Sequence, residues 1–276
     1  MIELFKEYQG KYYIVPFERK TFSGGEENVR ITGTFSSADK LFIKATISSS
    51  QEFMALAMLR GAIEAKNSSQ SVRLEMPYLP YARQDRICNP GEALGIKVFA
   101  KQLNALKFNK VTVWDCHSDV GLALVDRVIN KSLDEIMDSF LLARAAIQRS
   151  VLIAPDAGAA KKVYGLAESY NRPVVMANKK RDMLTREIVK TSIDLSQVHV
   201  GTSAMVVDDI CDGGRTFMGL GELIKEQTGR KPFLYVTHGI FSYNSLPKLV
   251  EIYSDIFVAH DVRNGNTNQH FTQNNV

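Results

Sequence analysis

The sequence predicts an α/β protein built from two similar domains with parallel sheets. Strands and amphipathic helices alternate along the chain, as they do where helices cover both faces of a parallel sheet. At 276 residues the chain exceeds a typical single domain. A break near Asn130 to Asp134 separates two halves that each repeat a strand, a loop and a helix. We therefore expect an N-terminal domain over residues 1–132, a C-terminal domain over residues 133–263 and a mobile polar tail over residues 264–276.

The individual elements follow from local composition and hydrophobic periodicity. Short β-branched and aromatic runs between polar or glycine-containing stretches predict strands. These runs are three segments within 11–47 (YYIVPF, NVRITGTF and LFIKATI) and the segments 72–79, 111–115, 151–154, 174–177, 204–209, 233–237 and 256–259. Apolar residues at helical spacing predict helices over 51–65, 92–106, 133–148, 161–169, 217–226 and 245–251. A hairpin-like region is expected to extend to Asp194.

Composition excludes several classes of protein. Hydrophobic residues make up 45% and charged residues 23% of the chain, and no apolar run reaches the about 18 residues of a membrane span. Three cysteines without CxxC spacing favour a reducing, cytoplasmic location over a disulfide frame or a thiolate zinc site. The net charge of +4 and the lack of a long basic stripe argue against nucleic acid as a partner. Small polyanions are a sufficient partner for the few basic clusters.

The stretch from Val206 to Met218 holds the clearest candidate binding site. An apolar strand runs into adjacent carboxylates, and a glycine turn and a helix follow. Unpaired amides at the first turn of a helix, next to a turn without Cβ atoms, suit a phosphate group. The carboxylates would repel a phosphate and better suit ribose hydroxyls or Mg²⁺. Taken alone, the stretch could also be an ordinary strand end and turn. Its candidate residues are Asp208, Asp209, Asp212, Gly213, Gly214, Arg215 and Thr216.

Four other loops carry groups that suit a polyphosphate. Guanidiniums and an amide offer fixed donors to a triphosphate and a purine edge, and a short basic cluster suits a small polyanion. Small residues after an aspartate let the backbone approach a diphosphate while the carboxylate holds its metal. A solvated salt-bridged loop, a satisfied loop histidine, an N-capping aspartate and a solvated basic face are the competing interpretations. The residues are Arg83, Gln84, Asp85 and Arg86; His117; Asp156, Ala157 and Gly158; and Lys179 and Arg181.

Two strings resemble one enzyme family closely. YLPYARQDR, from Tyr78 to Arg86, and VVDDICD, from Val206 to Asp212, resemble the signatures of the ribose-phosphate pyrophosphokinases (PRPP synthetases). The matches run in family order from about Phe22 to Asp261. The resemblance implies two domains of type I phosphoribosyltransferase-like (Rossmann-like) fold. It also implies transfer of the diphosphate of ATP to the anomeric hydroxyl of ribose 5-phosphate, which gives PRPP and AMP.

The resemblance also implies a role for each candidate residue. Lys179 and Arg181 match the basic pair on the family's catalytic loop. His117 and Asp156 match residues that meet Mg²⁺. ATP binding is implied for Phe22, Glu26, Arg83, Gln84, Asp85, Arg86 and His117, a diphosphate loop for Asp156, Ala157 and Gly158, and ribose 5-phosphate binding for Asp208, Asp209 and Asp212 to Thr216. Family members work as dimers assembled into hexamers, so a homodimer or homohexamer is expected.

Several positions depart from the family pattern. Gly24 replaces an aspartate in the loop that reaches the adenine of ATP on a neighbouring subunit, which affects nucleotide preference. The loop 87–91 is uncharged where the family loop is basic, and Arg215 stands where the family has glycine. These departures leave open a catalytically silent regulatory subunit. A phosphoribosyltransferase that consumes PRPP is a second alternative, but it would leave the YARQDR string and the two-domain length unexplained.

Overall fold

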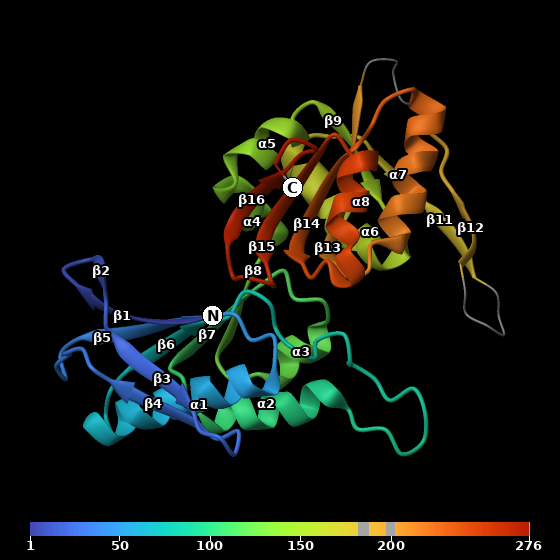
Figure 1. The fold of residues 1–276 in the computed structure, drawn as a ribbon. Helices are drawn as coiled ribbons and strands as arrows, with labels where there is room; N and C mark the ends of the chain where they lie inside the picture. Colours follow the sequence, from blue (N-terminus) through green and yellow to red (C-terminus); the bar gives the residue numbers. More distant parts are fainter. Residues whose placement is uncertain (182–187, 197–201, 276) are drawn as a thin grey trace. The chain divides into compact units, whose positions relative to one another are not determined.

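The chain folds into two compact α/β units, Met1–Lys131 and Ser132–Val276, each with a six-stranded sheet (Figure 1). The computed structural model describes residues 1–181, 188–196 and 202–275. Both sheets are dominated by parallel pairs flanked by helices, so the α/β fold class is confirmed. None of the helices within these ranges has the length and hydropathy that a bilayer crossing requires.

The sheet of the first unit has the strand order β2-β1-β5-β6-β7-β8. Four strands are parallel: β5 (Lys40–Ala45), β6 (Val72–Glu75), β7 (Lys110–Trp114) and β8 (Val128–Lys131). The N-terminal β1 (Ile2–Tyr8) and β2 (Lys11–Ile14) extend this sheet in antiparallel pairing. A separate hairpin is formed by β3 (Phe17–Thr21) and β4 (Glu27–Ile31). The helices are α1 (Ser50–Lys66), α2 (Gly95–Ala105) and α3 (Asp119–Leu124).

The helices α1 and α2 lie on the same face of this sheet (Figure 1). Their rings meet, because the centroids of Phe53 and Phe99 are 5.1 Å apart. Strands β5 to β8 are adjacent in chain order, and right-handed crossovers between consecutive neighbours put every connecting helix on one side. Burial accordingly alternates along β6 and β7. The expectation that helices cover both faces is therefore wrong for this unit.

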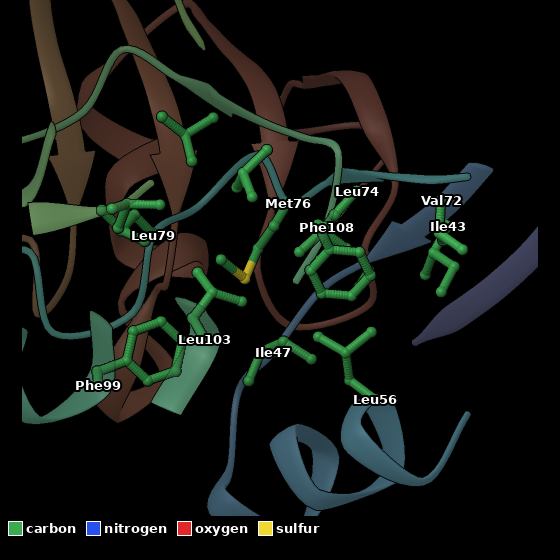
Figure 2. Packing of buried hydrophobic residues seen from close by; sticks show 14 of the residues in the cluster. Ile43, Ile47, Leu56, Val72, Leu74, Met76, Leu79, Phe99, Leu103 and Phe108 are labelled. Carbon is green, nitrogen blue, oxygen red and sulfur yellow. The ribbon is translucent and has the colours of Figure 1, made fainter. Parts of the chain in front are cut away.

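One apolar core fills the space between these helices and the sheet. Figure 2 shows Ile43 and Leu74 from the strands facing Leu56 of α1, with Leu103 of α2 beside them. The ring of Phe108 lies among them and is 1% exposed. Because the core anchors both ends of each crossover, it fixes where the loops after β6 and β7 begin.

The sheet of the second unit has the order β10-β9-β13-β14-β15-β16. Its five parallel strands are β10 (Val174–Met176), β9 (Ser150–Ala154), β13 (Ser203–Cys211), β14 (Phe233–Gly239) and β15 (Asp255–Asp261). A separate hairpin is formed by β11 (Asn178–Arg181) and β12 (Ile188–Ser192), within the region expected to be hairpin-like. The helices are α4 (Leu133–Ser139), α5 (Leu141–Ile147), α6 (Ala157–Tyr170), α7 (Arg215–Thr228) and α8 (Ser245–Ile252), with a short turn η1 (Ser242–Asn244).

This second sheet is doubly wound. The connection from β9 through α6 to β10 steps one way along the sheet, whereas β13, β14 and β15 step the other way. Right-handed crossovers then put α6 on one face and α7 and α8 on the other. The order reverses between β9 and β13. Ligands bind at such a switch point, outside the carboxyl ends of the strands.

Two expectations about this unit are wrong. The helix expected over 133–148 is split at Phe140, whose φ of −109° and ψ of 85° are not helical. Its buried ring packs edge-on against Phe257, which favours the break. The expected mobile tail instead contains strand β16 (Thr267–Phe271), antiparallel to β15. The polar strand is stabilised at this sheet edge because His270 stacks on Phe257 and its Nε2 donates a hydrogen bond to the Asp255 carboxylate at 2.8 Å.

Candidate functional site

The candidate residues of the second unit flank the switch point of its sheet. Asp156 lies two residues after the end of β9, and Asp208 and Asp209 lie near the end of β13, the next strand of the sheet. The Asp156 carboxylate Oδ1 accepts hydrogen bonds from the amides of Gly158 at 3.0 Å and Ala159 at 3.2 Å. It thus caps α6, the structural role that the sequence also suggested. The small residues after it leave the first turn of α6 uncovered by long side chains.

The adjacent aspartates are held in different environments. Asp209 is 8% exposed, and its Oδ2 lies 3.3 Å from the Lys162 ammonium of α6. The Asp209 amide donates to Asp208 Oδ1 at 2.9 Å. Burial of its carboxyl, followed by the charges of Asp209 and Asp156, raises the pKa of Asp208 well above its usual value. The two adjacent carboxyl groups therefore offer several oxygen atoms for hydrogen bonds with sugar hydroxyls.

The turn after β13 leads directly into α7. Gly214 caps α7 with a φ of 72° and no side-chain hydrogen bond, so the first-turn amides face outward without a capping side chain. A Cβ on Gly214 would lie 3.2 Å from both Met218 Cε and Ser245 Cβ. Only glycine fits this conformation without strain. Arg215 is exposed at the start of the helix, and Thr216 is half-buried.

Hydrogen bonds from the segment between β14 and α8 hold the turn after β13 in place. The Cys211 carbonyl accepts from the amides of Ile240 at 2.8 Å and Phe241 at 3.1 Å. Ser245 Oγ donates to the Asp212 carbonyl at 3.2 Å. These contacts hold Asp212 and the two glycines in place before any ligand arrives, which is the preorganisation that a phosphate cradle requires.

In the first unit, two candidate loops lie together. Hydrogen bonds from Ser118 and Arg86 lower the pKa of Asp85 against the opposing effect of burial, which is the largest single influence and raises it. The Arg86 Nε lies 3.2 Å from Asp85 Oδ1. Gln84 packs against Gly95, and its carbonyl accepts from the Ile96 amide at 3.3 Å. The Arg83 to Arg86 loop is therefore tied both to α2 and to the loop after β7.

His117 is exposed at the tip of that second loop. The preceding Asp115 is 3% exposed and has a left-handed φ of 39°. The Cys116 amide donates to Asn130 Oδ1 at 2.9 Å, and Ser118 caps α3 by accepting from the Val120 amide at 3.2 Å. A strained, anchored backbone of this kind presents the imidazole outward beside the Asp85 loop.

The remaining candidate loops of this unit are closed by internal contacts. In the β3–β4 hairpin the Phe22 amide donates to the Glu26 carbonyl at 2.8 Å, and Gly25 has a φ of 88°. Phe22 is 45% exposed and Glu26 is exposed. The uncharged loop 87–91 folds onto Glu92, which accepts from the amides of Cys88 and Asn89 at 3.0 Å.

Lys179 and Arg181 lie on strand β11, which pairs with β12. Their side chains, and residues 182–187 between the two strands, are outside the described residues. His117 and Asp156, the expected metal ligands, belong to different units. Within the described ranges, no group of three or more His, Cys, Asp or Glu side chains is arranged to hold a metal ion.

Sequence reasoning missed three residues that shape these sites. Lys162 pairs with Asp209, Ser118 binds Asp85, and Glu27 anchors the β3–β4 hairpin. Hydrogen bonds from Arg19, Thr21 and Gln51 lower the pKa of Glu27 to about 2. Lys162 lies six positions after Asp156 in the chain, where helical spacing could have placed it near the strand end. No local pattern separates Glu27 from its exposed neighbour Glu26.

Known proteins share both sequence and fold with this chain. Residues 7–106 match the family model of the N-terminal domain of ribose phosphate pyrophosphokinase. A ribose-phosphate pyrophosphokinase of Pyrococcus furiosus is 27% identical over 93% of this chain and 89% of its own length. That of Campylobacter jejuni is 24% identical over 93% and 83%. The crystal structure of phosphoribosylpyrophosphate synthetase from Mycobacterium smegmatis superposes with a TM-score of 0.72 at 20% identity and covers 89% of this chain and 80% of its own.

The family model covers much of the first unit, and the relatives extend the similarity through the second. The YLPYARQDR and VVDDICD strings fall in the anchored loops of the two units, at the carboxyl ends of parallel strands. Sequence, fold and motif position agree in this similarity, although the identity to each relative is low. The chain is thus similar to ribose-phosphate pyrophosphokinases over most of its length, and residues 7–106 match the model of that family's N-terminal domain.

Proposed function

We propose that the protein is a ribose-phosphate diphosphokinase, which converts ATP and ribose 5-phosphate to PRPP and AMP. The observation that carries this function is the arrangement at the switch point of the second sheet. There the Asp208–Asp209 pair stands beside a glycine turn and an uncapped helix start, so that one site offers groups for hydroxyls and for a phosphate. The relatives named ribose-phosphate pyrophosphokinase support the same reaction.

In this proposal, ribose 5-phosphate binds to the second unit. Its 5-phosphate accepts hydrogen bonds from the amides between Gly213 and Thr216, where the α7 dipole favours negative charge. Arg215, exposed at the first position of α7, adds a guanidinium to the phosphate. Asp209, held by Lys162, accepts from a ribose hydroxyl, while Asp208 orients a second one.

ATP binds through the anchored loops of the first unit. Arg83 and Arg86 supply planar donors for the triphosphate, and Gln84 offers an amide to the purine. His117 stands beside them, because Ser118 ties its loop to Asp85. The Phe22 to Glu26 turn protrudes from a hairpin and is proposed to reach ATP on a neighbouring subunit, which makes the protein a homodimer or a homohexamer.

The chemical step is attack of the anomeric hydroxyl oxygen on the β-phosphorus of ATP. A new oxygen–phosphorus bond forms as the bond between the β-phosphorus and the bridging oxygen of AMP breaks, and the hydroxyl proton is lost to solvent or to a basic group. Negative charge grows on the bridging and equatorial oxygens, so positioning and cations matter more than covalent chemistry. Lys179 and Arg181 are proposed to neutralise this charge.

Mg²⁺ is the proposed cofactor. The residues present suit a Mg²⁺ ion that enters the site bound to the phosphates of ATP. Mg²⁺ typically uses one or two protein carboxylates and completes its shell with water and phosphate oxygens. No preformed three-ligand metal site exists among the described residues. Asp156 does lie close to Asp208, because its negative charge contributes to the raised pKa of Asp208. His117 in the first unit and Asp156 in the second are each proposed as a ligand for such a cation, which would supply charge neutralisation. Both substrates are cell metabolites, and we propose a cytoplasmic location.

The test is coupled product release. Purified protein is given ATP, Mg²⁺ and ribose 5-phosphate, and AMP and PRPP are quantified over time. We expect AMP in step with PRPP, and loss of nearly all activity in the Lys179→Ala variant. A folded protein that releases no AMP would favour the silent regulatory subunit instead. Diphosphate release from PRPP with a nucleobase would favour a phosphoribosyltransferase.

A further inference from the structure

We propose that Tyr243 is a binding residue that covers the sugar of the bound pentose phosphate and that its strained backbone is retained for this contact. The inference deepens the proposed function and rests on it. Tyr243 lies in the connection between β14 and α8, which is bonded to the phosphate turn through the carbonyls of Cys211 and Asp212. Its position relative to Gly213 is therefore fixed within one unit.

The backbone of this connection is unusual. Phe241, Tyr243 and Asn244 all have left-handed φ values, of 49°, 57° and 53°. Side chains other than glycine are disfavoured in this region, and asparagine and aspartate tolerate it best. Such strain persists only where the surrounding structure or a function maintains it.

Two of the three strained residues have a structural explanation. Phe241 is 4% exposed, its ring packs against Phe271, and the Arg263 guanidinium lies 5.0 Å above it. Burial of this ring stabilises its conformation. Asn244 belongs to a residue type that adopts left-handed φ readily. Neither residue requires a ligand to explain its backbone.

Tyr243 has no such explanation, because its side chain is 91% exposed. Its ring gains little from burial, although tyrosine is poorly suited to this backbone. The ring edge stands over the first glycine of the phosphate turn: a Cβ on Gly213 would lie 3.4 Å from Tyr243 Cδ2 and 3.7 Å from Cε2. The aromatic ring and the amides of α7 thus border the same space.

This position suits a sugar attached to a phosphate. A pentose whose 5-phosphate rests on the α7 amides extends past Gly213, where its C–H face meets the ring and its hydroxyls reach the phenol. An aromatic side chain provides a large apolar contact and a polar tip with few rotatable bonds. Gly213 leaves room for that approach because it has no side chain. Inorganic phosphate alone does not extend to the ring.

The experiment compares ligand affinity with stability in the full-length protein without ATP. Calorimetry measures the Kd of ribose 5-phosphate and of inorganic phosphate for the wild type and for Tyr243→Gly and Tyr243→Asn, which both accept the left-handed backbone. We expect the Kd for ribose 5-phosphate to rise about tenfold, the size of one good aromatic contact. We expect the Kd for inorganic phosphate and the thermal midpoint of the unliganded protein to stay level, or the midpoint to rise as strain is released.

Matched controls separate the ring from the backbone. Asn244→Gly relaxes the adjacent left-handed residue and should leave both Kd values unchanged, and Tyr243→Phe should keep most of the affinity. Wild-type affinity in both Tyr243 variants would overturn the inference, and so would an equal loss for both ligands or a lowered thermal midpoint. Absence of ribose 5-phosphate binding in the wild type would instead refute the proposed function.

Discussion

Replacing Gly214 by alanine is predicted to destabilise the second unit and to weaken the proposed sugar-phosphate site. The residue has a φ of 72°, and a non-glycine residue in the left-handed region costs about 1–2 kcal/mol. The added Cβ would meet Met218 Cε and Ser245 Cβ at 3.2 Å and Leu249 Cδ1 at 3.3 Å. Crowding of this kind adds about 1 kcal/mol, and reduced freedom of the unfolded chain returns about 0.5 kcal/mol.

The net effect on the free energy of unfolding is a loss of about 2 kcal/mol. For a unit of this size, that lowers the thermal midpoint by about 6 °C. Differential scanning calorimetry measures it, with Gly219→Ala as the matched control in the same helix. A Cβ at Gly219 meets nothing within 4 Å, so alanine there should stabilise α7 by about 0.5–1 kcal/mol. The reasoning is refuted if both variants change the midpoint in the same direction.

Two further predictions concern charged groups that sequence reasoning missed. Lys162→Met removes the cation from Asp209 and leaves three carboxylates near one another, so the KM for ribose 5-phosphate should rise about tenfold. Lys162→Arg should retain most affinity, and an unchanged KM in Lys162→Met would contradict the assigned role. The lowered pKa of Glu27 contributes stability that is present above about pH 4.5 and lost as pH falls toward 2. Glu27→Gln should therefore unfold more readily at pH 7 and lose the acid-dependent part of unfolding over that window, and wild-type acid unfolding in this variant would count against the assignment.

Local sequence signals predicted the parts of the fold that depend on neighbouring residues. The Val206 to Met218 stretch combines a β-branched run, adjacent glycines and helical periodicity, so its strand, turn and helix are all found within two or three residues of their expected ends. The β11–β12 hairpin also falls where a hairpin-like region was expected. Alternation of strands and helices was sufficient to predict the α/β class.

Tertiary packing decided the features that the sequence did not reveal. The helix breaks at Phe140 because its ring packs on Phe257 of strand β15. Strand β16 forms because it pairs with β15, despite its polar side chains. Strand order determines which face of each sheet the helices cover, and sequence alone does not give that order.

The candidate site was likewise predicted in part. Residues at strand ends were identifiable from sequence, because turns and helix starts follow them directly. Their partners were not, since Lys162 is one of two adjacent lysines and only the fold selects the one that reaches Asp209. Tyr243 has no local signal for a left-handed backbone, and its position over Gly213 depends on contacts between two strand connections.

The most direct test of the account follows the phosphorus atoms of ATP during turnover. Phosphorus NMR of a mixture of protein, ATP, Mg²⁺ and ribose 5-phosphate distinguishes a diphosphate bound to the sugar from free diphosphate, ADP and inorganic phosphate. The account predicts that AMP and PRPP appear in equal amounts and only when ribose 5-phosphate is present. Formation of ADP, or of AMP with free diphosphate irrespective of the sugar, would contradict it.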